Sequence, residues 1–106
     1  MKGGMQNIMR QAQQMQRKMQ KIQEELSNLE VEASAGGGMV TVRVNCQHKV
    51  LDVKIDPEIA NAEDLDMLQD LIVAAVNEAH RLAEQKHKEE MEKVVPAGMM
   101  NNLGLF

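Results

Sequence analysis

The residues best suited to bind a ligand are basic and polar side chains near the start of the chain. Four of them share one face of a helix, over roughly 16 Å, because they follow one another at helical spacing: Arg10, Gln14, Arg17 and Lys21. We call this set the basic stripe. Such a row can pair with the phosphates of nucleic acid, each contact releasing counterions. The alternative is a solvated helix face without a ligand.

The distribution of charge favours an anionic partner, although the chain as a whole has a formal net charge of −4. Residues 1–21 contain five basic residues and no acidic one, whereas residues 22–106 contain seven basic and sixteen acidic residues. A ligand responds to the local field, which is screened over about 8 Å at physiological salt. The first 21 residues are therefore the predicted contact region for a polyanion.

A possible metal site lies in the second half of the chain. His80, Glu84 and His87 fall at i, i+4 and i+7, so they share one helix face. No fourth ligand stands at the spacing of a known zinc motif. We therefore interpret the three as surface residues and expect neither a metal nor another cofactor.

The sequence offers little for catalysis. Its only serines are Ser27 and Ser34, it has no tyrosine, and no nucleophile stands beside a plausible base. Turn chemistry and strand alternation account for the carboxylates Asp52, Asp56 and Glu58. We predict no enzymatic activity and no small-molecule substrate.

Glycines 36–38 do not form a phosphate-binding P-loop, because no Lys-Ser or Lys-Thr pair follows and the next predicted element is a strand. Cys46 is the only cysteine, which excludes an internal disulfide and favours the reducing cytosol. We interpret it as a small core residue. No apolar run approaches the roughly 20 residues that cross a bilayer, and no secretory signal is present. The expected localisation is cytoplasmic.

The element that must position the basic stripe is a helix over residues 5–29. Its apolar residues alternate gaps of three and four, the heptad pattern of a helix that packs along one partner helix. These residues, the apolar seam, are Met5, Ile8, Ala12, Met15, Met19, Ile22, Leu26 and Leu29. The partner is either a second copy or the second helix of the same chain. The small size of the chain favours a second copy.

A change to period two predicts strands over residues 29–35, 40–46 and 51–56, and the short connections make them antiparallel neighbours. In the third strand Leu51, Val53 and Ile55 are predicted to point inward. A second helix, from near Asn61 to about residue 93, has an apolar stripe broad enough to lie on a sheet. The fold class is α+β, one domain over residues 1–106, with a frayed start at residues 1–4 and a flexible tail at residues 97–106.

Several short motifs stand in a characteristic order along the chain. They are Met9-Arg10-Gln11-Ala12-Gln13-Gln14-Met15-Gln16, Lys18-Met19-Gln20-Lys21, Gln23-Glu24-Glu25-Leu26, Val53-Lys54-Ile55-Asp56-Pro57, Glu63-Asp64, Leu68-Gln69-Asp70-Leu71 and Asn77-Glu78-Ala79. Together with the glycine stretch before Val40 and a Gly-Met-rich tail, they resemble the YbaB/EbfC family of bacterial nucleoid-associated proteins. The resemblance covers nearly the whole chain. The chain differs from the usual family pattern at Cys46, where the family commonly has glycine.

The resemblance implies a homodimer in which the sheet continues between subunits and helices project like the arms of tweezers. It also implies binding of duplex DNA with relaxed sequence preference, in the nucleoid, with a role in nucleoid organisation and gene expression. The family's contacts are attributed to the projecting helices. The candidate DNA-binding residues here are Lys2, Arg10, Arg17, Lys18 and Lys21 of the first helix, and Arg81, Lys86, Lys88 and Lys93 of the second. The alternative function is a protein-interaction module whose heptad helix docks a partner without binding DNA.

Overall fold

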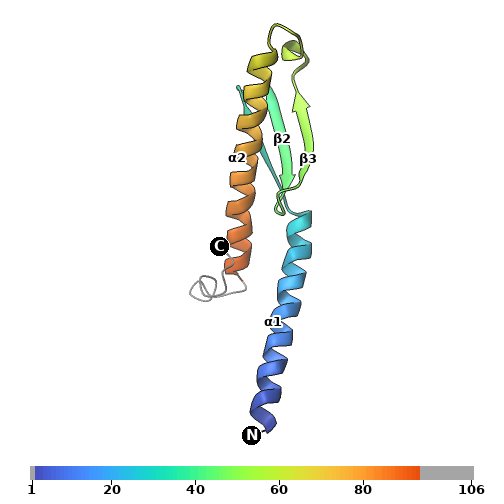
Figure 1. The fold of residues 1–106 in the computed structure, drawn as a ribbon, viewed down its shortest axis with the longest axis vertical. Helices are drawn as coiled ribbons and strands as arrows, with labels where there is room; N and C mark the ends of the chain where they lie inside the picture. The colour runs from blue at the N-terminus through green and yellow to red at the C-terminus, as the bar shows by residue number, and fades with distance from the viewer. Residues whose placement is uncertain (1, 94–106) are drawn as a thin grey trace.

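The computed structural model describes residues 2–93 and has the predicted order of helix, three-stranded meander and helix (Figure 1). The tail predicted at residues 97–106 lies outside the described residues. The molecule is elongated, with extents of 74 × 22 × 17 Å, because the first helix projects away from the sheet while the last helix lies against it. The elements are α1 (Lys2–Asn28), β1 (Glu30–Ala35), β2 (Val40–Asn45), β3 (Val50–Ile55), a 3-10 turn η1 (Pro57–Ile59) and α2 (Leu65–Glu92).

The sheet is antiparallel throughout, in the order β1-β2-β3. Val42 at its centre pairs with Ala33 on β1 and Val53 on β3. α2 packs against β1 and β2, and its small residues allow the helix to approach the strands closely. The buried side chains of this main core are Ala33, Val40, Val42, Val44, Ile59, Ala75, Ala79 and Ala83.

A second cluster joins α1 to the rest of the molecule. Ile22 and Leu26 of α1 are buried against Cys46, at the end of β2, and against Met91 of α2. The apolar seam is therefore divided. Its C-terminal half is covered within the chain, whereas Met5 and Ile8 near the free end are 71% and 67% exposed.

The predicted inward residues of β3 are not buried, and this part of the prediction is wrong for the single chain. Leu51, Val53 and Ile55 are 36%, 39% and 37% exposed. The alternation holds for Val53 and Ile55, which pair with the buried Val42 and Val40 and so share their face of the sheet. It is interrupted at Leu51, where the register shifts and Val50 pairs with Val44. The side chains are exposed because α2 covers β1 and β2 and leaves β3 open.

Both helices differ from the prediction at their N-terminal ends. α1 begins at Lys2, so it includes Gly3 and Gly4, which the sequence placed in a frayed start. α2 begins at Leu65, not near Asn61. The Asn61 side chain instead organises a turn, accepting a hydrogen bond from the Asp64 backbone at 2.9 Å and donating to the Glu58 carbonyl at 2.9 Å. Such local bonds compete with helix formation.

The turn between β1 and β2 gives a matched pair of glycine substitutions. Gly36 and Gly37 have φ of +64° and +68°, where an alanine costs about 1–2 kcal/mol. Only at Gly36 would an added Cβ also approach another residue, lying 2.9 Å from Leu71 Cδ2. We expect Gly36→Ala to lower the unfolding free energy more than Gly37→Ala, because Leu71 must shift. Urea denaturation measures both, and equal losses would contradict the steric argument.

Candidate nucleic-acid interface

Four cationic residues of α1 are accessible to a ligand. Arg10, Arg17, Lys18 and Lys21 are exposed, and none of them takes part in the ion pairs formed within residues 2–93. The residues of the basic stripe lie on the face of α1 opposite the apolar seam. Ile22, a residue of the seam, is buried in the second cluster. The side chain of Lys2 is not among those described.

The cations of α2 are in a different electrostatic environment. Arg81 donates two hydrogen bonds to Glu78, at 3.0 and 2.6 Å, and these raise the pKa of Arg81 and lower the pKa of Glu78. Lys93 donates to Glu90 at 2.9 Å, which raises the pKa of Lys93. Because Arg81 and Lys93 are already paired with carboxylates, they have less to gain from a phosphate than the cations of α1. Lys86 is half-buried, and Lys88 is exposed.

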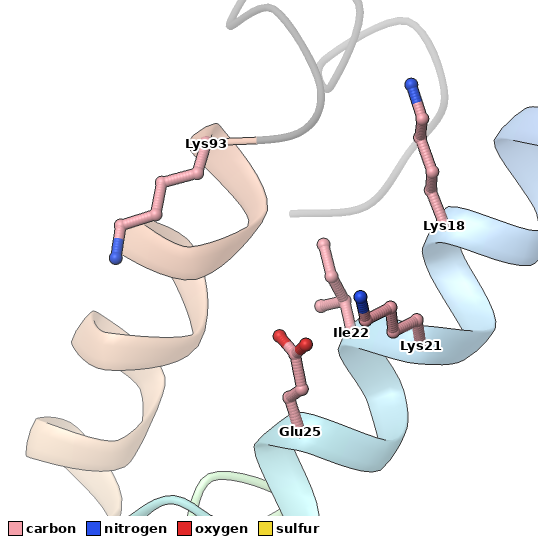
Figure 2. Close-up of a pocket in the computed structure, with 5 residues that line it drawn as sticks. All are labelled: Lys18, Lys21, Ile22, Glu25 and Lys93. Carbon is pink, nitrogen blue, oxygen red and sulfur yellow. The ribbon is translucent and has the colours of Figure 1, made fainter.

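The structure brings cations of both helices to one pocket. Lys18, Lys21, Ile22 and Glu25 of α1 line an open pocket of about 330 Å³ together with Lys93 of α2. Figure 2 shows Lys93 across this pocket from the α1 side chains. A second hollow of about 250 Å³ lies further along α1 and is lined by Gln11, Gln14, Met15 and Lys18. The basic surface thus extends from α1 to the end of α2.

The β2–β3 turn, residues 46–49, fixes the C-terminal end of α1. The last carbonyls of a helix lack partners within the helix. Here the backbone N–H of Cys46 donates to the Leu26 and Leu29 carbonyls, at 3.1 and 2.9 Å, and the Gln47 side chain donates to the Gln23 carbonyl at 2.7 Å. The direction in which α1 projects from the sheet, with its basic stripe, therefore depends on the β2–β3 turn.

We call these contacts between the β2–β3 turn and the end of α1 the joint. Asn45 is its central residue. It is 4% exposed, and its Oδ1 accepts hydrogen bonds from the backbone N–H groups of Gln47 and Lys49, at 2.9 and 3.0 Å. Its Nδ2 donates to the Ser27 carbonyl on α1 at 3.3 Å. This role of Asn45 was not predicted from the sequence. The only signal was an asparagine before a turn, which is a common arrangement with no implied link to a distant helix.

Cys46 is a buried free thiol, as expected for a small core residue. Burial raises its pKa, which the charge of Lys86 opposes and that of Glu90 supports. Fewer thiolates form as a result, and the thiol is poorly suited to nucleophilic chemistry.

The histidines gather around the same turn. The rings of His48 and His80 are 5.4 Å apart and edge to face, and burial lowers the pKa of His87 with help from the charge of His48. Within residues 2–93 no group of three or more histidine, cysteine, aspartate or glutamate side chains is arranged to hold a metal ion. In that same part of the chain, no helix is long and apolar enough to cross a membrane.

Comparison with known proteins gives matches along the whole chain. The model of the YbaB/EbfC DNA-binding family matches residues 1–99. A nucleoid-associated protein of Alkaliphilus metalliredigens is 53% identical over 102 residues, covering 96% of this chain and 88% of that protein. A nucleoid-associated protein of Clostridium novyi is 46% identical over 108 residues, covering 100% of this chain and 93% of that protein.

The fold also has a close match among solved structures. The crystal structure of an uncharacterized protein from Helicobacter pylori superposes with a TM-score of 0.70, covering 77% of this chain and 86% of that chain. The two sequences are 23% identical, so this likeness describes the fold alone.

Proposed function

The chain belongs to the YbaB/EbfC DNA-binding family, as the resemblance in its sequence indicated, and from this premise we propose that it is a nucleoid-associated protein that binds duplex DNA as a homodimer. The observation that carries the proposal is the set of unpaired cations on α1, the arm that projects beyond the sheet. The proposed localisation is the nucleoid, where such binding would contribute to DNA organisation and gene expression.

The proposed contacts are to the phosphate backbone. Arginine and lysine side chains that contact phosphates position a protein without reading the sequence. Relaxed sequence preference follows, because phosphate contacts themselves carry no sequence information. The described residues contain no tyrosine, tryptophan or phenylalanine that could stack on unpaired bases, which favours duplex over single-stranded DNA. We propose Arg10, Arg17, Lys18 and Lys21 as the main contacts.

The open side of the sheet supports a second copy as partner. Among residues 2–93, β3 pairs only with β2, so its other edge has backbone N–H and C=O groups without sheet partners in that part of the chain. The same strand exposes Leu51, Val53 and Ile55. A second β3 would continue the sheet and cover these apolar side chains, and it would also present the basic stripe twice.

A substitution on β3 tests this interface. We expect Val53→Lys to shift the protein from dimer to monomer, because a lysine would place a charge in the apolar strip that the second copy covers. Lys54→Val, on the opposite face of the same strand, is the matched control and should leave the dimer intact. Light scattering coupled to size-exclusion chromatography gives the mass of each. A Val53→Lys protein that remains dimeric would place the interface elsewhere.

One observation favours the alternative function of a protein-interaction module. Met5 and Ile8, at the free end of the apolar seam, are 71% and 67% exposed and have the spacing that docks a partner helix. This surface lies opposite the basic stripe, so DNA binding does not require it.

Fluorescence anisotropy of labelled duplex DNA, titrated with the protein at several salt concentrations, distinguishes the two functions. If α1 contacts DNA, the logarithm of the affinity should fall with the logarithm of salt by about 0.9 per phosphate neutralised. Absence of binding at low salt, with a folded dimer, would reject the DNA-binding proposal for this chain. The apolar seam would then become the surface to test with protein partners.

A further inference from the structure

The β2–β3 turn touches both helices and so couples them. Its Gln47 side chain donates to the Gln23 carbonyl near the end of α1, at 2.7 Å. One residue later, the His48 ring packs edge to face on the His80 ring of α2, with an interplanar angle of 72°. His48 has a φ of +65°, in the left-handed region, so the turn holds this ring against α2 at some conformational cost.

The α2 side of this contact offers no acceptor for an added proton on His80. The Nε2 atom of His80 is buried and has no hydrogen-bond partner among the described residues. A proton on this nitrogen would create a buried donor without an acceptor. His87 lies two turns further along α2, and its pKa is lowered by burial and by the charge of His48, while Glu84 raises it.

The other charged groups around the histidines lie on α2 and on the β2–β3 turn. Glu84 faces His87, while Lys86 and Glu90 act on Cys46 at the end of β2. Lys49 follows His48 on the turn and is exposed. Residues 45–47 donate hydrogen bonds to uncharged backbone carbonyls at the end of α1 and just after it, namely those of Gln23, Leu26, Ser27 and Leu29.

We propose that the histidines His48, His80 and His87 make the β2–β3 turn a proton-sensitive anchor for the α1 arm. Neutral rings pack and hold the turn between the helices. Protonated rings would place like charges about 5 Å apart, as the ring centroids are separated by 5.4 Å. The turn then leaves α2, and its hydrogen bonds to the end of α1 weaken.

The direction of the pH dependence follows from proton linkage. Burial at the anchored turn and the charge of His48 lower the pKa of His87, whose ordinary value is about 6.5, so the released turn takes up a proton more readily than the anchored turn. Anchoring is therefore complete above pH 6.5 or so and is lost as the pH falls below it. The consequence for DNA rests on the proposed function, since α1 is the arm that would contact DNA.

Hydrogen exchange at single residues tests the anchor without DNA. The Cys46 amide, which donates to the Leu26 and Leu29 carbonyls, reports directly on the joint. We expect its protection factor, corrected for intrinsic exchange rates, to fall at least tenfold between pH 7.5 and pH 5.5 in buffer with a metal chelator. The Val42 amide in the centre of the sheet is the internal control and should change less.

Two variants distinguish a proton effect from general acid destabilisation. His80→Phe keeps a ring against His48 but cannot be protonated, so most of the pH dependence should disappear. His48→Asn tolerates the left-handed backbone but lacks the ring, and the Cys46 amide should exchange faster at both pH values. A pH-independent protection factor in the wild type would overturn the proposal, as would a full pH effect in His80→Phe.

A second readout is DNA affinity at constant ionic strength. Added positive charge alone would tighten binding at pH 5.5, whereas release of the arm should weaken it at least threefold relative to His80→Phe. Tighter binding in the wild type than in His80→Phe would overturn the link between the anchor and DNA. If no DNA binds at any pH, the proposed function fails, while the exchange experiment still decides whether the anchor responds to protons.

Discussion

Replacing Arg10, Arg17 and Lys21 by alanine is expected to lower the affinity for duplex DNA by about two to three orders of magnitude at 0.1 M salt. Each phosphate contact contributes about 0.9 to the slope of log affinity against log salt. Three lost contacts therefore reduce the slope by about 2.7 for each arm of the dimer that contacts the duplex. One arm alone amounts to roughly 2.7 decades between 1 M and 0.1 M salt, and a second arm in contact would add to the loss. The three residues are exposed on α1, so their removal should not affect the fold.

Anisotropy titrations at several salt concentrations measure both the affinity and the slope. The matched control replaces Gln13, Gln16 and Gln20 by alanine, three exposed residues of the same helix without charge. It changes the helix propensity of α1 but no phosphate contact, so affinity and slope should stay close to wild type. If both triple variants bind equally well, α1 is not the arm that contacts DNA, and the paired cations of α2 would need to be tested.

Replacing Asn45 by alanine is expected to lower the unfolding free energy by about 3 kcal/mol or more. The substitution leaves three backbone groups at the joint without partners, namely the N–H groups of Gln47 and Lys49 and the Ser27 carbonyl. Each polar group left buried and unsatisfied costs about 1–3 kcal/mol. The total loss stays below the sum of three such costs, because Gln47 and Lys49 are exposed and water can reach their backbone in part.

Urea denaturation followed by circular dichroism gives the loss for Asn45→Ala. Asn61→Ala is the matched control, because Asn61 also makes three hydrogen bonds but is exposed at the turn before α2. Water can replace its partners, so its loss should be about 1 kcal/mol. Similar losses for both variants would mean that burial of Asn45 contributes nothing and that the joint is not fixed by this side chain.

Most of the fold was predictable because its signals are local. The strands show alternation that the register confirms, with Val40, Val42 and Val44 buried on one face. The start of α2 was predicted at the wrong residue because Asn61 and Asp64 form a turn whose hydrogen bonds do not show in the apolar pattern. The acidic residues placed there suit a helix start as well as a turn.

The residues of the candidate site were predictable from the sequence, but the contacts that hold α1 in place and the ion pairs of α2 were not predicted. The spacing of Arg10, Arg17 and Lys21 places them on one exposed helix face, and the structure agrees. The pairing of Arg81 with Glu78 and of Lys93 with Glu90 separates the α2 cations from those of α1. The two residues of each pair are three positions apart in the sequence, so these ion pairs could have been predicted from the spacing of the charges.

The sequence by itself determined a long heptad helix, a basic first segment, a three-stranded meander and membership of a DNA-binding family. Only the tertiary structure decided that Ile22 and Leu26 are covered within the chain while Met5 and Ile8 remain exposed, and that Asn45 holds the end of α1. Periodicity specifies which face of an element is apolar, because it depends on backbone geometry alone. What covers that face depends on where α2 ends and which strands it reaches, and these are set by packing between residues far apart in the chain.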